Sequence, residues 1–317
     1  REPDLILWVI RSDGALCGMT YDRSQSYDRS QDIVGWHLHV TGPDQDFVDG
    51  KFESVVVIPH PDGDREQAWF IVNRDINGTA KRFVEFFETK GINYENQNVD
   101  SGLVYDGEKN LALTLGATTG NDILFTATGA FVAGDVGREI REIGGKTGRA
   151  TVVTFTDANN VRCDINNVFS SVSIAAKKWG IAIFSAVGLD HLNGEIVKVV
   201  GDGAVYNDLT VAGGAVILTP AIASTKIEAG LAYNSNLQTL RPDLPTTTGT
   251  IQGLLKRVVS VSVRLYKTLG ATINDEIIPF RKAGDLMDQP PSLFSGEIIK
   301  TNLGFDRDAL ITIKQNQ

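Results

Sequence analysis

Short runs of β-branched and aromatic residues, separated by turn signals, constrain the fold of this chain more than any other feature. Ser12-Asp13-Gly14 and Asn77-Gly78 are two of the separating turns in the first stretch. Asn-Gly and Asp-Gly favour two-residue hairpin turns, because these residues tolerate positive φ angles. Runs of this length, about ten residues apart, predict antiparallel strands. The expected strands are Leu5–Arg11, Leu16–Asp22, Ile33–Val40, Phe52–Ile58, Ala68–Asn73 and Lys81–Phe87.

This first stretch, residues 1–90, is therefore predicted to be a β meander, resembling either propeller blades or a sandwich. Trp8, Trp36 and Trp69 recur near strand centres about thirty residues apart, which favours β-propeller blades mildly. Ordinary core packing explains the same spacing, so both architectures stay open. We expect this meander to be part of a larger domain.

The second stretch, residues 100–172, is predicted to be a small barrel. Its short strands are joined by tight Gly/Asn/Asp turns, and its length is similar to that of SH3-like modules. The expected strands are Asn110–Leu115, Ile123–Thr128, Val136–Ile143, Ala150–Phe155 and Val161–Ile165.

The third stretch, residues 173–317, is predicted to be a β-rich sandwich or propeller-like domain. Val258–Leu265 alternates with a period of two and is β-branched, which favours a strand over the helix that Gln252–Leu269 could otherwise form. Other expected strands are Gly194–Gly201, Ala204–Leu218, Lys226–Tyr233, Gly296–Thr301 and Ala309–Lys314. Helical periodicity is scarce throughout, so the fold class is predicted to be all-β.

Charge and composition limit the partners of the chain. The 39 acidic and 30 basic residues give a net charge of −9, which argues against a dedicated nucleic-acid binder but not against a surface that DNA passes. Cys17 and Cys163 alone cannot build a four-cysteine zinc site or a disulfide framework. No run approaches the roughly 18 apolar residues of a membrane helix. The chain opens at Arg1 without Met or a signal-peptide pattern, so we expect a fragment of a longer protein.

Two motifs could suggest ligand chemistry. Gly145-Lys146-Thr147 resembles the end of a phosphate-binding loop, but that loop needs a glycine where this chain has Ile140. The triplet also lies between expected strands, so a hairpin turn is the better interpretation. His37 and His39 lie two residues apart on an expected strand and share a face, which could supply half of a metal site. Nothing in the sequence places further ligands beside them, and packing at a sheet edge or interface explains them better.

The candidate catalytic groups also lack the partner residues that their chemistry would need. His191 follows Asp190 in an expected turn, where an aligned carboxylate–imidazole pair is rare, and no Gly-x-Ser-x-Gly elbow exists. Asp13, Asp106 and Asp202 lie at or near glycines, which is typical of turns. We therefore predict no catalytic, cofactor-binding or metal-binding residues, no cofactor and no enzymatic activity.

Several segments resemble the tail nozzle proteins of short-tailed bacteriophages, the tubular tail protein B-like family. The matching residues are strand and turn signatures spread over most of the chain. They comprise Leu7–Arg11, Gly14–Leu16, Thr20–Arg23, Val34–His37 with His39, Glu53–Pro59, Gln67–Gly78, Gly188–Gly194, Val199–Gly203, Gly230–Tyr233, Leu293–Gly296 and Asn302–Asp308. One departure is the exact duplication of Tyr21–Gln25 as Tyr27–Gln31, which predicts a longer hairpin tip.

The resemblance implies a structural virion protein located in the phage tail. Such proteins form a homo-oligomeric ring, commonly a hexamer, below the adaptor ring, and the ring gates and conducts the ejected genome. The implied partners are further copies of the chain, the adaptor and the tail fibre or spike proteins, with genomic DNA only as passing cargo and no membrane insertion. The resemblance also implies that the small barrel is like the first catalytic-cysteine half-domain (FCCH) of ubiquitin-activating enzymes. Cys163 has only Arg162 as a basic neighbour, so ubiquitin chemistry is not implied.

Two other classes of function remain as alternatives. A tail-associated protein could bind a host-surface carbohydrate through the loops Tyr21–Gln31 and Pro242–Gly249. An extracellular propeller hydrolase would need a cluster of facing carboxylates or histidines, which the sequence does not indicate.

Overall fold

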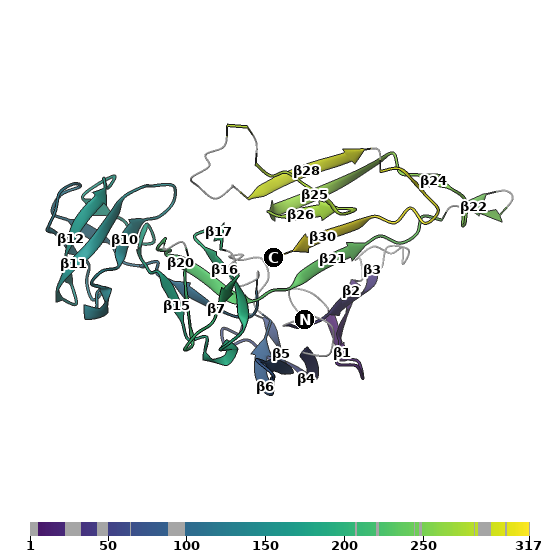
Figure 1. Cartoon of the computed structure of the whole chain (residues 1–317), viewed down its shortest axis with the longest axis horizontal. Coiled ribbons are helices and arrows are strands. Elements are labelled where there is room, and N and C mark those ends of the chain that lie inside the picture. Colours follow the sequence, from purple (N-terminus) through teal and green to yellow (C-terminus); the bar gives the residue numbers. More distant parts are fainter. Residues whose placement is uncertain are drawn as a thin grey trace. The chain divides into compact units, whose positions relative to one another are not determined.

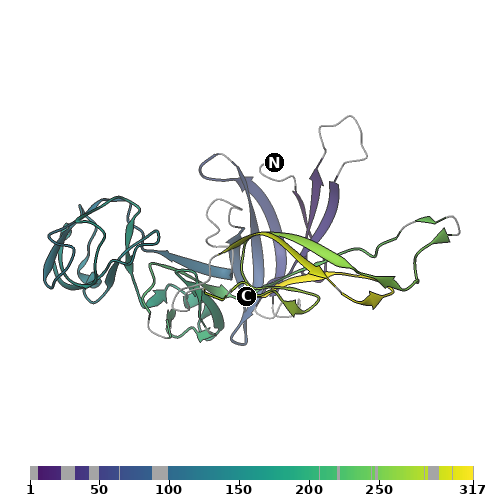
Figure 2. The same cartoon turned by 90° about the horizontal axis from the view of Figure 1, so that it is seen from above.

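The computed structural model confirms that the chain is all-β, with 57% of its residues in strands and 2% in helices. Its packing forms two compact units, residues 1–232 and 233–317, and each is described by itself (Figures 1 and 2). The residues described are 6–22, 33–42, 50–63, 65–87, 99–206, 208–219, 222–243, 245–246, 249–281, 283–284, 293–301 and 303–316.

The first unit begins with two antiparallel three-stranded sheets, β1-β2-β3 and β4-β5-β6. Their strands are β1 (Ile6–Ile10), β2 (Leu16–Asp22), β3 (Ile33–His39), β4 (Gly50–Pro59), β5 (Glu66–Ile76) and β6 (Thr79–Phe86). Asn77 and Gly78 have φ angles of 50° and 74°, so the hairpin predicted between the last two strands is confirmed. The two sheets share one core, in which Trp8 and Leu16 pack with Phe52, Phe70 and Val72.

A nearly closed, barrel-like sheet of seven strands follows, in the order β13-β8-β9-β12-β11-β10-β14 (Figure 2). Its strands are β8 (Leu113–Leu115), β9 (Ile123–Thr126), β10 (Glu139–Glu142), β11 (Arg149–Asp157), β12 (Asn160–Asn167), β13 (Ser173–Ile174) and β14 (Trp179–Ala182). The strand expected from Val136 begins only at Glu139, because Ala133–Asp135 forms a 3-10 turn and Gly137 has a φ of 86°. Phe125, Ile140 and Trp179 are fully buried inside the barrel.

The barrel is inserted between two paired strands of another sheet. β7 (Asp100–Asp106) precedes the barrel, and β20 (Lys226–Leu231) follows it, yet the two strands are hydrogen-bonded neighbours. This sheet continues through β16 (Ile196–Gly201) to β17 (Ala204–Val205), with β18 (Leu209–Thr210) also on β16, while β15 (Ser185–Val187) pairs with β19 (Ala215–Ile217). The prediction of one strand over Ala204–Leu218 is wrong, because Gly213 and Gly214 adopt positive φ and turn the chain.

The second unit is also built from antiparallel strands. It contains a four-stranded sheet, β21-β30-β26-β27, and a long ribbon, β25-β28. Two shorter pairs are formed by β22 (Pro245–Thr246) with β23 (Gly249–Thr250) and by β24 (Lys256–Arg257) with β29 (Phe305–Asp306). The main strands are β21 (Asn234–Gln238), β25 (Ser260–Thr268), β26 (Ala271–Ile273), β27 (Glu276–Ile277), β28 (Phe294–Thr301) and β30 (Thr312–Asn316). The strand predicted over Val258–Leu265 is thus found with a shifted start. Val261, Val263 and Ile298 of the ribbon pack against the buried Ile273 and Ile311.

Candidate functional site: a buried arginine–carboxylate cluster

The most developed polar site in the described chain surrounds the guanidinium of Arg74. Arg74 lies on β5, on the face that also carries the buried Phe70, Val72 and Ile76, so the sheet pairing turns its side chain inward. The side chain is completely inaccessible to solvent. A buried cation is costly unless it is paired and hydrogen-bonded, and the surrounding segments supply that pairing.

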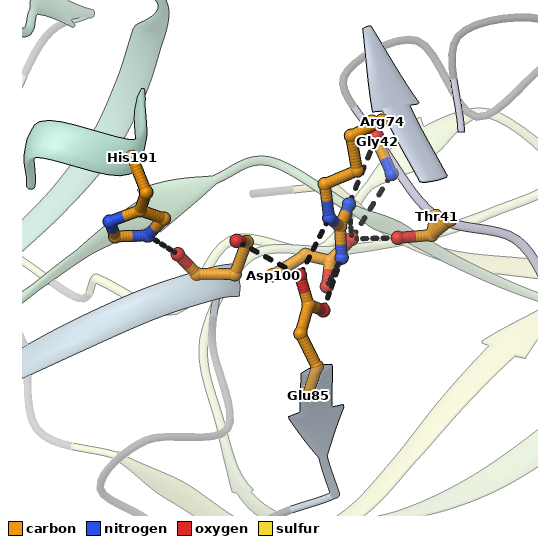
Figure 3. Close-up of polar contacts among 7 residues, drawn as sticks. Thr41, Gly42, Arg74, Glu85, Asp100 and His191 are labelled. Atoms are coloured by element: carbon orange, nitrogen blue, oxygen red, sulfur yellow. Dashed lines mark hydrogen bonds and ion pairs between the residues drawn. The ribbon is translucent and has the colours of Figure 1, made fainter. Parts of the chain in front are cut away.

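All five N–H groups of this guanidinium have acceptors (Figure 3). Glu85 of β6 accepts from Nε at 2.9 Å and from Nη2 at 2.6 Å. Asp100 of β7 accepts from Nη1 and Nη2, both at 2.9 Å, and the Gly42 carbonyl accepts from Nη1 at 3.0 Å. Two carboxylates therefore hold the fork in a fixed plane, the geometry for which arginine is best suited.

The carboxylate of Asp100 has further donors. Thr41 Oγ1 donates to Oδ2 at 2.6 Å, and the Gly42 amide donates to the same oxygen at 3.0 Å. The Ser101 hydroxyl donates to Glu85 Oε1 at 3.2 Å. The cluster thus ties the segment around Thr41 and the strand β7 to the β5–β6 hairpin.

Burial alone would raise the pKa of Asp100, but the charge and hydrogen bonds of Arg74, with those of Thr41 and Gly42, outweigh it and leave the pKa below the ordinary 3.8. The same carboxylates raise the pKa of Arg74 against the effect of its burial. Asp100 therefore holds no proton to donate near neutral pH. The cluster fits the structural fixing of strands better than acid–base catalysis.

Acid should weaken the cluster. Because the folded-state pKa of Asp100 is lowered, its contribution to stability is complete above the unfolded pKa and is lost as pH falls through the folded value. We expect the difference in unfolding free energy between wild type and Asp100→Asn to be largest near neutral pH and to shrink as the pH falls below about 3.9, the pKa of an unfolded aspartate. Urea unfolding across this range measures it. A difference that stays constant with pH would contradict the assignment.

His191 lies beside the cluster and contacts the backbone of β7. Its Nε2 is 2.9 Å from the Ser101 carbonyl (Figure 3). Its ring also makes an edge-type contact with the ring of Phe83, with the two centroids 6.1 Å apart. Leu189 and Leu192 on either side are fully buried, and Asp190–Leu192 forms a 3-10 turn. The turn predicted for this segment is confirmed, and its two leucines anchor it in the core.

Of the other histidines considered from the sequence, all of which the structure describes, only His37 and His39 contact each other. His37 and His39 do share the inner face of β3, with Nδ1 and Nε2 2.7 Å apart, and both rings pack against Trp8. His60 contacts Arg65 in a loop. In the ranges that the structure describes, no group of three or more His, Cys, Asp or Glu side chains could hold a metal ion.

The three aspartates near glycines lie in three separate parts of the fold. Asp13 pairs with Arg11 and accepts from the Ala15 amide, while Asp106 accepts from the Glu108 amide. Asp202 accepts from the amides of Thr225 and Lys226, and Arg141 of the barrel strand β10 reaches it at 3.4 Å. Asp202 thereby joins the barrel to the β16-β20 pair, a role that the sequence did not indicate.

The Gly145-Lys146-Thr147 triplet lies between β10 and β11, as expected for a hairpin connection. Gly144 and Gly145 have φ angles of 85° and 80°, which a tight turn requires. The strands on both sides exclude the helix N-terminus that a phosphate-binding loop would need.

Cys163 lies on β12, inside the barrel, with no accessible surface. Burial, with the nearby Asp164, raises the pKa of this thiol to about 12, which suppresses the reactive thiolate. We expect a maleimide at neutral pH to modify the partly exposed Cys17 of the native chain and to reach Cys163 only after unfolding. Mass spectrometry of the two peptides measures this, with Cys17→Ser as the control. Rapid native labelling of Cys163 would contradict the buried assignment.

A cavity of about 510 Å³ lies between the barrel and the neighbouring strands β7, β15 and β20. Its lining is mainly apolar, and the Arg138 guanidinium at its wall donates to Asp135 at 2.8 Å. The wall also includes Leu103, Val104, Tyr105, Val136, Gly137, Ile183, Phe184, Ala186, Val187 and Leu189. We assign it no ligand, since nothing in its lining selects one chemistry.

Among known proteins, no protein-family model and no curated protein sequence matches the chain. Among the residues described, no helix has the length and apolar character to cross a membrane. Of the two loops considered for carbohydrate binding, the duplicated Tyr27–Gln31 lies outside the described residues, as do Leu244, Thr247 and Thr248 of the other.

Proposed function

We propose that this chain is a structural protein of the bacteriophage virion, a protomer of a tail nozzle or tube that forms a ring and gates and conducts DNA ejection. The support is the sequence resemblance, together with an all-β architecture of small modules joined by buried polar contacts. In this proposal the chain works mechanically, and no residue is assigned a catalytic role.

The observation that carries the proposal is the position of a resembling segment, Gly188–Gly194. Gly188 and Gly194 have φ angles of 91° and 94°, and the leucines between them are core residues. The amide of Asn77 in the β5–β6 hairpin donates to Glu195 at 2.5 Å, immediately beyond this segment. The residues of this segment are therefore ones that the fold itself needs, which favours a shared scaffold over a chance similarity of surface loops.

The proposed partners are further copies of the chain in a ring, commonly six, the phage adaptor above the ring and the tail fibre or spike proteins. DNA is proposed as passing cargo. A net charge of −9 suits that role, because duplex phosphates are repelled by an acidic wall and adhere to Lys/Arg surfaces.

The lumen charge tests this proposal. In an electron-microscopy structure of the assembled ring, we expect carboxylates to outnumber Lys and Arg along the channel, and we expect no duplex DNA to be retained in a gel-shift assay at low salt. A basic lumen or tight DNA retention would contradict it. Specific signals on a glycan array would instead favour the alternative of a tail-associated carbohydrate-binding protein.

A further inference from the structure

The sheet β1-β2-β3 exposes an apolar outer face. Strand pairing places Leu7, Met19 and Trp36 in one row across the sheet and Val9, Cys17 and Leu38 in the next. Leu7, Val9, Trp36 and Leu38 are 41–62% exposed. We call these six residues face A. An antiparallel sheet with one solvated face normally alternates apolar and polar residues, so an outer face of this composition departs from the usual pattern.

The sheet β4-β5-β6 has an outer face of the same kind. One row consists of Val56, Trp69 and Phe86, with the two aromatic rings 5.0 Å apart, and the next consists of Ser54, Ile71 and Val84. Val84 is 70% exposed and Val56 53%. We call these six residues face B.

The two faces lie on opposite sides of one sandwich. The inner faces of both sheets meet in a shared core, where Trp8 of β1 contacts Phe70 of β5. Neither face A nor face B contains a charged side chain. The nearest charges on β4 and β6, Glu53 and Arg82, pair with each other at the border of face B.

We propose that face A of one copy packs on face B of the next copy, so that the chain assembles head-to-tail. A chain with a net charge of −9 repels its own copies, and close approach therefore favours surfaces without charge. Both faces are three strands wide, about 14 Å, which suits face-to-face sheet packing. A symmetric contact of either face with itself would leave the other face of every copy uncovered, whereas a head-to-tail contact covers both.

The size of the faces sets the strength of this contact. Three strands by about 17 Å of strand length give a footprint of about 250 Å², well below the roughly 800 Å² per partner of a standard stable interface. One contact is therefore weak and forms only at high protein concentration. A closed ring is more stable, because every copy in it makes two such contacts. Head-to-tail contacts close into rings or extend into filaments. The inference rests on the proposed ring and names the surfaces that build it.

Single charges on each face test the pairing. Trp36→Lys places a charge on face A, and Val84→Lys places one on face B. Each should raise the dissociation constant for self-association of the full chain at least tenfold, as measured by sedimentation velocity. Val205→Lys is the matched control, because Val205 is a similarly exposed valine (74%, against 70% for Val84) that lies on β17, outside both faces. Circular dichroism establishes that each variant is folded.

Mixing the two variants separates head-to-tail from symmetric contact. The Val84→Lys chain keeps face A, and the Trp36→Lys chain keeps face B, so the mixture should form pairs and stop there. Cys17 reports on face A directly: its maleimide labelling in the Val84→Lys chain should slow when the Trp36→Lys chain is added.

Three other outcomes would contradict the inference, and each shows which part of it is wrong. If Val84→Lys behaves like Val205→Lys, or if the mixture does not associate, faces A and B do not pair. If both variants still form rings, the pairing is wrong while the proposed ring stands. If the wild-type chain itself stays monomeric at high concentration, both fail.

Discussion

Replacing Arg74 by methionine should lower the free energy of unfolding by about 3–5 kcal/mol, since breaking a buried ion pair leaves charge uncompensated. The substitution removes all five hydrogen bonds of the guanidinium and leaves Glu85 and Asp100 without their shared cation. Urea unfolding followed by circular dichroism measures the loss. Arg74→Lys should recover part of it, because an ammonium keeps the charge but not the planar fork.

Two further variants show whether the loss arises from the buried charge. Arg82→Met on the neighbouring strand removes a guanidinium whose pair with Glu53 is on the surface, and we expect almost no change in stability. Adding Glu85→Gln to Arg74→Met should recover stability, because it removes one of the two unpaired carboxylates. Equal losses for Arg74→Met and Arg82→Met would contradict the role of the cluster.

The second large effect is expected at Trp179 in the barrel. Its side chain is fully buried beside Phe131, and its indole N–H donates to the Leu111 carbonyl at 2.6 Å. Trp179→Ala should cost about 3–5 kcal/mol, because it leaves a large cavity and an unpaired carbonyl. Circular dichroism is the suitable probe, since the substitution removes a fluorophore.

Trp36→Ala is the matched control for this prediction. It makes the same chemical change at a position that is 62% exposed, so we expect little loss in dilute solution, where self-association is absent. Combined with Arg74→Met, Trp179→Ala should act additively, because the barrel core and the arginine cluster share no residue. A small effect of Trp179→Ala would contradict the buried packing of the barrel.

Local signals in the sequence predicted much of this fold. Asn77-Gly78 and Asp202-Gly203 both form turns with positive φ angles between paired strands. The period-two pattern of Val258–Leu265 correctly favoured a strand. These signals succeed because hairpin turns and side-chain alternation depend on neighbouring residues alone.

Long-range pairing could not be predicted in this way. The pairing of β7 with β20 joins residues more than a hundred positions apart, and the whole barrel lies between them in the sequence. Nothing in the sequence of either strand indicates which strand it pairs with. The break at Gly213-Gly214 was missed because the surrounding residues are β-branched and apolar.

The arginine cluster did leave a signal that could have been used. Arg74 falls at an inward position of an alternating strand, between Val72 and Ile76, where a charge requires a buried partner. The sequence could not show which carboxylates supply it, since Glu85 and Asp100 lie on two other strands. The apolar residues of faces A and B were likewise indistinguishable from core residues.

The central claim is ring assembly. Its most direct test is the mass of the particle that the full chain forms as the protein concentration rises. From a 34.4 kDa protomer, the proposal predicts that sedimentation velocity converges on one multiple, the mass of a closed ring. A species that stays at the protomer mass, or a series that grows without limit as filaments do, would contradict it.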